Sequence, residues 1–134
     1  GPLRPVLYVP ADHVGLRAYL DWDQLHELVD AGFWLGSHGY DHTPLREASD
    51  ADLPHQVGAS KAFFEEALGI TIDAFCYPYG SYDQRTLSAL TAHGYTSAMT
   101  LNPLGYQTPG EPLLLNRLLV DYDMTLEEFT ELLP

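Results

Sequence analysis

The chain has 134 residues, 46% of them apolar, which is enough to form one domain with a buried core, and we expect residues 1–134 to be a single domain. Nineteen acidic residues against six basic ones give a formal net charge of −13, which argues against nucleic acid and anionic lipid as partners because both bind through Lys and Arg. No apolar run is long enough to cross a membrane, and no charged-then-apolar leader is visible at the start.

Short apolar strands alternate with helices along the chain. We predict helices over 21–32, from Ser49 to Gly69, over 84–94 and after Thr125, where Glu128 completes a capping box. The predicted strands are 5–10, 33–37, 72–77, 95–100 and, after a Pro- and Gly-rich loop, 113–120. This alternation predicts an α/β fold with a parallel sheet, either an open sandwich or part of a (β/α) barrel. In both folds the chemistry lies at the carboxyl ends of the strands.

The stretch "GSHGYDHTPL" (36–45) places two histidines, His38 and His42, directly after a predicted strand. Neutral imidazole is a common zinc ligand, but this is not the helical H-E-x-x-H pattern, because Gly39 follows His38 and Pro44 follows closely after His42. Spacing alone favours a polar loop, but with the position after a strand and with Gly36, Gly39 and Pro44 shaping the backbone, a metal pair and a polar loop are equally open. Asp41, between the histidines, is either solvated or a hydrogen-bond partner of an imidazole N–H. Asp12, after the first strand, is a weak candidate for a further ligand.

A second group, "YPYGSYD" (77–83), follows the third strand. Pro78 and Gly80 predict a sharp turn that leaves the Tyr79 backbone N–H free to stabilise an oxyanion. The alternative is a plain strand-to-helix connection with Asp83 as the helix cap. Cys76, the only cysteine, lies in an apolar run, so we expect a buried structural thiol and neither a disulfide nor a multi-cysteine zinc site.

Two segments, "LDWDQLHELVDAGFWLGSHGYDHTPL" and "FCYPYGSYDQRTLSALTAHGYTSAMT", together resemble the polysaccharide deacetylases, the nodulation-factor-deacetylase-like domains of carbohydrate esterase family four. The resemblance extends to the closing "RLLVDYDMTLEEF". It implies an irregular (β/α) barrel and removal of N- or O-acetyl groups from a polysaccharide. It also implies that His38 and His42 bind a divalent metal, usually zinc, that Pro78, Tyr79 and Gly80 line the substrate groove, and that the Tyr79 N–H is catalytic.

The chain also departs from this family's pattern. Gly39 replaces a hydroxyl residue, and Cys76 replaces the arginine that orients the catalytic base. The family's first strand, with its paired aspartates that act as the base and the third metal ligand, has no counterpart here, so the domain is interpreted as N-terminally incomplete. A late Leu-x-His segment, which supplies the general acid, is also missing. We therefore expect weak activity or none from this chain.

Two further hypotheses remain open. The domain could be a degenerate deacetylase that binds glycans, with Trp34, Tyr40, Tyr77, Tyr79 and Tyr82 as aromatic surfaces near the groove. It could also be an unrelated metal-binding α/β domain. An absent first strand would leave an open sheet edge through which the chain could form a homodimer. The resemblance implies the cell envelope, the periplasm or the exterior as the location, where acetylated polysaccharide is found.

Overall fold

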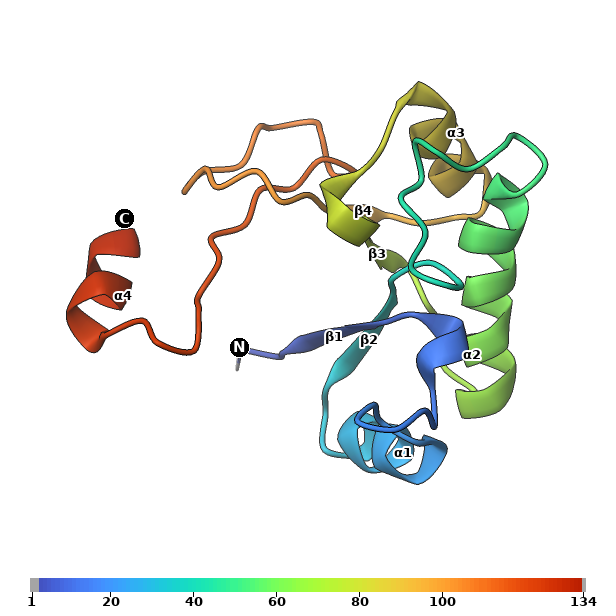
Figure 1. Ribbon diagram of the computed structural model, residues 1–134, viewed down its shortest axis with the longest axis horizontal. Helices are drawn as coiled ribbons and strands as arrows, with labels where there is room; N and C mark the ends of the chain where they lie inside the picture. Colours follow the sequence, from blue (N-terminus) through green and yellow to red (C-terminus); the bar gives the residue numbers. More distant parts are fainter. Residues whose placement is uncertain (1–2, 134) are drawn as a thin grey trace.

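The computed structural model describes residues 3–133 and contains one parallel four-stranded sheet (Figure 1). The strands are β1 (Val6–Val9), β2 (Trp34–Ser37), β3 (Ala74–Cys76) and β4 (Ser97–Met99), in the spatial order β1-β2-β3-β4. Helices α1 (Trp22–Asp30), α2 (Ser60–Leu68) and α3 (Gln84–Ala92) connect successive strands and pack along one side of the sheet. The predicted α/β alternation with parallel strands is confirmed.

Local signals in the sequence explain where the helices begin and end. Capping boxes start α1 at Asp21 and α3 at Asp83, and Gly69 ends α2 in the left-handed conformation. The helical region predicted from Ser49 also forms, since the Ser49 hydroxyl accepts the Asp52 N–H at 3.2 Å. Its first part, His55–Ala59, is a wider π-helical segment, and regular α-helix begins only at Ser60.

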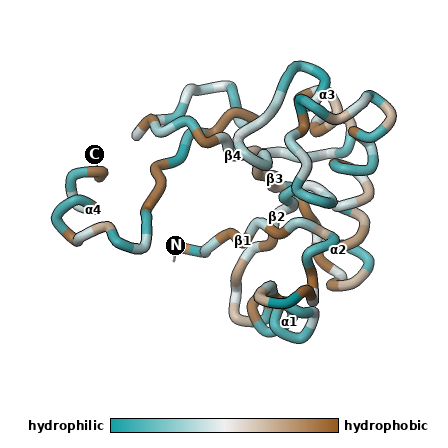
Figure 2. Tube along the Cα trace, in the orientation of Figure 1, coloured by the Kyte–Doolittle hydropathy of each residue, from teal (hydrophilic) through white to brown (hydrophobic). Residues whose placement is uncertain are grey.

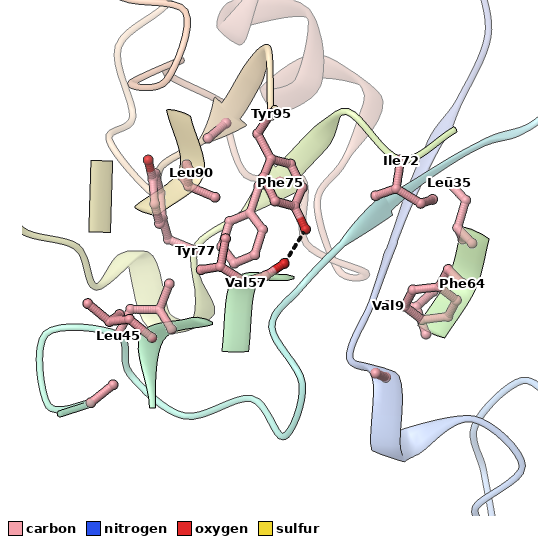
Figure 3. Packing of buried hydrophobic residues seen from close by; sticks show 14 of the residues in the cluster. Val9, Leu35, Leu45, Val57, Phe64, Ile72, Phe75, Tyr77, Leu90 and Tyr95 are labelled. Carbon is pink, nitrogen blue, oxygen red and sulfur yellow. Dashed lines mark hydrogen bonds between the residues drawn. The ribbon is translucent and has the colours of Figure 1, made fainter. Parts of the chain in front are cut away.

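The core lies between the sheet and the three helices (Figure 3). Its largest fully buried apolar side chains are Leu25, Leu45, Val57, Phe64, Ile72, Phe75, Tyr77 and Leu90. The Tyr95 hydroxyl, also in this layer, donates to the Val57 carbonyl at 2.8 Å, so its polar end is satisfied. Figure 2 shows the hydrophobic positions that mark the strands. Leu7 and Val9 of β1, and Phe75 and Tyr77 at β3, belong to this core or pack against it. Tyr8 and Cys76, which lie between them, therefore face the opposite, inner side of the sheet.

The prediction of a strand over 113–120 is wrong, except for a single β-bridge at Leu115. Leu115 bridges Met99 in parallel, but Leu119 and Val120 are 63% and 55% exposed and pair with no strand among residues 3–133. Helix α4 (Leu126–Leu132) follows the expected Thr125 cap, has no buried residue and lies away from the sheet (Figure 1). The apolar pattern after residue 115 therefore has no partner surface in the described part of the chain. None of the described helices is long and apolar enough to cross a membrane.

Gly36 of β2 lies close to the neighbouring strands β1 and β3, and its substitution tests this packing. A Cβ atom there would lie 2.5 Å from Cε1 of Tyr8 and 2.9 Å from the carbonyl oxygen of Ala74. We expect Gly36→Ala to lower the free energy of unfolding by about 1–3 kcal/mol, because strand β2 must shift to accept the methyl group. Urea denaturation measures this change. Gly105→Ala adds the same methyl group into open space, and an equal loss in that control would contradict the packing argument.

Candidate metal and substrate site

Three loops meet at the carboxyl edge of the sheet because the strands are parallel. β1 leads into Asp12 and His13, β2 leads directly into His38, and β3 leads into the Pro78–Gly80 turn. Backbone hydrogen bonds join the first two loops: the Ala11 N–H donates to the Gly39 carbonyl at 3.2 Å, and the Asp12 N–H donates to the Tyr40 carbonyl at 2.9 Å. The histidine loop also meets the Pro-Tyr-Gly turn, as predicted, because the His42 and Tyr79 rings pack together.

His38 and His42 point their Nε2 atoms toward one another. These two atoms are 3.0 Å apart, close to the roughly 3.3 Å that two imidazoles span on a tetrahedral zinc ion. Nδ1 of His38 lies 2.6 Å from the Cys76 carbonyl oxygen, so this nitrogen carries the proton and donates it. That hydrogen bond leaves the Nε2 lone pair of His38 available to a metal. The two Nε2 atoms thus converge although His38 and His42 lie in a loop and not on a helix.

The loop between the histidines is held by Gln56, which sequence analysis did not identify. The Gln56 side-chain oxygen accepts the Tyr40 N–H at 3.0 Å, and its amide nitrogen donates to the Asp41 carboxylate at 2.8 Å. Asp41 also accepts the Thr43 N–H at 3.0 Å. Asp41 is therefore exposed to solvent, as one of the two alternatives had it, and bonds to the loop's own framework instead of to an imidazole. Gln56 is buried in the π-helical segment, a feature often found at functional sites.

The electrostatics favour neutral imidazoles. Burial lowers the pKa of His38 below its ordinary value, against the hydrogen bond to the Cys76 carbonyl, which raises it. Burial also lowers the pKa of His42, and the neighbouring His13 lowers it further. A metal ligand must be deprotonated, so both shifts favour metal binding at neutral pH. By contrast, burial raises the pKa of the Cys76 thiol, which is 1% exposed, as expected of a structural cysteine.

A third protein ligand is not present among residues 3–133, where no three His, Cys, Asp or Glu side chains converge. The weak candidate, Asp12, turns its carboxylate to Nδ1 of His13 at 2.6 Å. His13 itself stands close to the pair, with its ring centre 6.2 Å from that of His42. The described residues therefore fit a divalent metal as two ligands of an incomplete set.

The Pro-Tyr-Gly turn adopts the predicted sharp bend. Tyr79 has a left-handed backbone, with φ of 56°, and its ring packs edge-on against His42 at a centroid distance of 4.7 Å. Within residues 3–133 the Tyr79 N–H has no hydrogen-bond acceptor, whereas the N–H groups of Gly80 and Ser81 are both bonded within the turn. A free, rigidly held N–H is what an oxyanion donor requires. Asp83 also caps α3, so the two interpretations of this segment are compatible.

Hollows lie on both sides of the histidine pair. One, of about 360 Å³, is lined by Tyr8, His13, Ala18, Tyr19, His38 and His42, among others. The other, of about 350 Å³, runs along Tyr79, Gly80 and Tyr82 to the 100–116 region. Both are open rather than enclosed. The histidine pair and the Pro-Tyr-Gly turn therefore each line an open hollow at this edge of the sheet, and the two hollows are together called the groove below.

Only part of the aromatic surface predicted for glycan binding faces this groove. Tyr79 does, and it is 66% exposed. Tyr77 does not, because its ring is fully buried in the core and its hydroxyl donates to the Leu113 carbonyl at 2.8 Å. Trp34 is exposed but begins β2, so it lies at the opposite end of the sheet beside Arg4. Tyr82 is half-buried against Tyr77 but also lines the second hollow. Tyr40 is half-buried against His55.

Known proteins share both the sequence pattern and the fold. The profile of the polysaccharide deacetylase family matches residues 7–98. The Bacillus subtilis protein YxkH, which bears the name of a polysaccharide deacetylase, is 24% identical over 101 residues, covering 75% of this chain and 36% of its own length. The Streptococcus pyogenes deacetylase PplD, solved in complex with acetate, superposes with a TM-score of 0.90 at 24% identity, over 98% of this chain and 59% of PplD.

Other solved structures extend the comparison. IcaB from Ammonifex degensii has a TM-score of 0.74 at 25% identity, over 89% of this chain and 57% of that chain. A pseudoenzyme of the CE4 family matches less well, with a TM-score of 0.64 at 18% identity, over 72% of this chain and 34% of its own. The chain thus spans well under two thirds of the length of these relatives, and the sheet is the partial barrel that sequence analysis predicted. With the family profile covering more than half of its residues, the chain belongs to the polysaccharide deacetylase family.

Proposed function

We propose that this chain carries the metal- and groove-forming part of a deacetylase that hydrolyses acetyl groups of a polysaccharide. The observation that carries the proposal is the 3.0 Å convergence of the His38 and His42 Nε2 atoms, with His38 oriented by the Cys76 carbonyl beside the Pro-Tyr-Gly turn. Membership of the family supports the reaction class, and the open groove supports a polymeric substrate.

The chain's own residues have separate roles in this reaction. His38 and His42 hold the divalent metal, zinc being the ion that best suits two imidazoles. A bound metal would polarise the acetyl carbonyl and lower the pKa of water. The Tyr79 N–H donates to the oxygen of that carbonyl as negative charge develops on it, and Pro78 and Gly80 keep the donor in place. Water adds to the carbonyl carbon, the C–N bond breaks, and acetate and a sugar amine are released.

Activity of this chain alone is expected to be feeble. Two imidazoles bind zinc weakly, no third His, Cys, Asp or Glu joins them among residues 3–133, and the Asp12 carboxylate bonds to His13. The loss of a general acid or base commonly costs about 10²–10⁴-fold in rate. The chain spans 36% of the length of YxkH and 59% of PplD, so the relatives have segments without a counterpart among residues 3–133.

The family membership also supports a location where acetylated polysaccharide occurs, in the cell envelope, the periplasm or outside the cell. In addition we propose homodimer formation through the free side of β1, which is the edge strand of the sheet. Sedimentation velocity at micromolar to submillimolar concentration should show a concentration-dependent dimer. A clean monomer throughout this range would contradict it.

We expect the chain to bind one zinc ion, and His38→Ala to weaken that binding by more than about tenfold. Zinc affinity should fall as the pH falls, because protons compete for the same nitrogen atoms. The lowered pKa of His38 means that this competition begins at a lower pH than it would at an exposed imidazole. Isothermal titration calorimetry against zinc chloride between pH 5.5 and 7.5 measures both effects.

His26→Ala is the matched control for this experiment, because His26 is exposed on α1, away from the site. Equal zinc affinity in His38→Ala and His26→Ala would contradict the metal site. Zinc bound by the wild-type chain and lost with His38 would support it and would leave the third ligand as the next group to identify.

The role of Tyr79 is testable because it depends on the backbone. Tyr79→Gly keeps the N–H and accepts φ of 56° without strain, so we expect the rate of acetate release from an N-acetylglucosamine oligomer to stay within about threefold of wild type. Tyr79→Val disfavours this φ and should reduce the rate by about 10²-fold, the scale of one lost oxyanion donor. Coupled-enzyme detection of acetate at saturating zinc measures both. A larger loss in the glycine variant would assign the role to the side chain.

A second candidate function is glycan binding without catalysis. It is favoured by the absence of a third ligand among residues 3–133 and by the occurrence of a CE4 pseudoenzyme among the structural neighbours. Because Tyr77 and Trp34 do not face the groove, such binding would depend on Tyr79 and Tyr82 and on polar groups around them. Saturable binding of an acetylated oligosaccharide by a chain that never releases acetate would favour this function.

A further inference from the structure

Both polar atoms of the Gln56 side chain bond to the loop between the two histidines. The oxygen accepts the Tyr40 N–H at 3.0 Å and lies 3.4 Å from the Asp41 backbone nitrogen, and the amide nitrogen donates to the Asp41 carboxylate at 2.8 Å. The side chain is almost fully buried, at 4% exposure. A carboxamide offers an acceptor and donors together, whereas a carboxylate of the same length offers acceptors alone. The loop therefore depends on an amide at position 56.

The π-helical segment that carries Gln56 is also linked to the start of the histidine loop. Ser60 follows this segment, and its hydroxyl donates to the Gln56 carbonyl at 2.6 Å. The Ser37 hydroxyl lies 2.8 Å from that of Ser60, and both side chains are fully buried. Ser37 is the residue immediately before His38. The segment is therefore bonded to the chain just before each of the two histidines.

Packing from other elements fixes the π-helical segment itself. The Tyr95 hydroxyl donates to the Val57 carbonyl at 2.8 Å, and the Val57 side chain is fully buried (Figure 3). A Cβ atom at Gly58 would lie 2.4 Å from Cε1 of His93, so the His93 ring occupies the space of a side chain there. Single π-helical turns are rare and are frequent at functional sites. Here the turn is anchored in the core and directs the Gln56 side chain to the loop.

His42 is the histidine whose backbone needs this support. Its φ of 65° is left-handed, a conformation that a residue with a Cβ atom keeps only when surrounding structure maintains it. A Cβ atom at Gly39 would lie 3.4 Å from the Gln56 oxygen, so Gln56 packs directly on the loop. Without the Gln56 bonds the loop would relax toward a more favourable backbone, and the 3.0 Å approach of the two Nε2 atoms would be lost.

We propose that Gln56 is a positioning residue that holds His38 and His42 in the converged geometry that a divalent metal requires. The effect on metal affinity rests on the proposed function, whereas the effect on the two imidazole rings does not. Gln56 acts through the loop backbone and the Asp41 side chain. The coupling is reciprocal, so a bound metal strengthens the bonds of Gln56 to the loop by the same factor as these bonds strengthen metal binding.

Zinc titration of Gln56 variants at neutral pH tests the effect on affinity. Gln56→Met keeps the side-chain length and removes both bonds, and we expect zinc affinity to fall by about tenfold, the lower end of the loss when groups that orient metal ligands are removed. Gln56→Glu places a second carboxylate against Asp41 and should also bind zinc more weakly. Adding Asp41→Asn to Gln56→Glu relieves this repulsion and should recover part of the affinity. Isothermal titration calorimetry measures all three.

Gln84→Met is the matched control, because Gln84 is exposed at the start of α3. It should bind zinc as the wild-type chain does. Wild-type zinc affinity in a Gln56→Met chain that circular dichroism shows to be folded would overturn the effect on affinity. Should Gln56→Met fail to fold, hydrogen exchange of the Tyr40 N–H in the wild-type chain decides. Zinc that slows this exchange supports the coupling, and an unchanged exchange rate overturns it.

The zinc-free chain separates this proposal from the proposed function. Long-range ¹H–¹⁵N spectra of the wild-type chain should show a proton on Nδ1 of His38 and on Nε2 of His42, because these atoms face the Cys76 carbonyl and Nε2 of His38. In Gln56→Met, or in Gln56→Glu if the former does not fold, the His42 resonances should shift or split while those of the exposed His26 stay unchanged. Unchanged His42 resonances would overturn the positioning role. A wild-type chain with this ring pair that binds no zinc would contradict the proposed function alone.

Discussion

The hydrogen bond from Nδ1 of His38 to the Cys76 carbonyl, 2.6 Å long, joins the two motifs on which the candidate site depends. It crosses from the end of β2 to the end of β3 and is available because these strands pair in parallel, with Ser37 opposite Phe75. It fixes which nitrogen of His38 carries the proton, and so directs the other nitrogen to His42. A shift of the β3 register by one residue would bring Phe75 or Tyr77 to this position and turn Cys76 to the core. The metal pair is thus a product of sheet pairing as well as of loop sequence.

The site stores backbone strain around this hydrogen bond. Three residues other than glycine have positive φ in the described chain, Ala18, His42 and Tyr79. Ala18 and His42 line the same hollow, and the Tyr79 ring touches His42. A left-handed backbone costs such residues roughly 1–2 kcal/mol each. Gln56 offsets part of this cost at the histidine loop, where it bonds both to the Tyr40 N–H and to Asp41. Strain concentrated at one edge is consistent with a site that must be rigid before its ligand binds.

The two faces of the sheet differ in how they are covered. The outer face is covered by three helices over a continuous apolar core, and its buried polar groups are bonded, as Tyr95 is to Val57. The inner face carries the side chains of Tyr8 and Cys76 and the close approach of Gly36 to Tyr8, and beyond Leu115 the residues Leu119 and Val120 pair with no strand among residues 3–133. The chain covers 59% of PplD and 57% of IcaB, which share this fold.

The sequence by itself determined the features that act over a few residues. Capping boxes at Asp21, Asp83 and Thr125 and a turn bent by Pro78 and Gly80 all follow from interactions between near neighbours. It also indicated that His38 and His42 lie beside that turn, since parallel strands end at one edge. Only the tertiary structure decided that Gln56 binds the histidine loop through Tyr40 and Asp41, and that Tyr77 lies in the core with its hydroxyl bonded to Leu113. The bonds from Gln56 to Asp41 and from Tyr77 to Leu113 join positions 15 and 36 residues apart. They depend on strand register and on which face each side chain takes, and no local pattern encodes either.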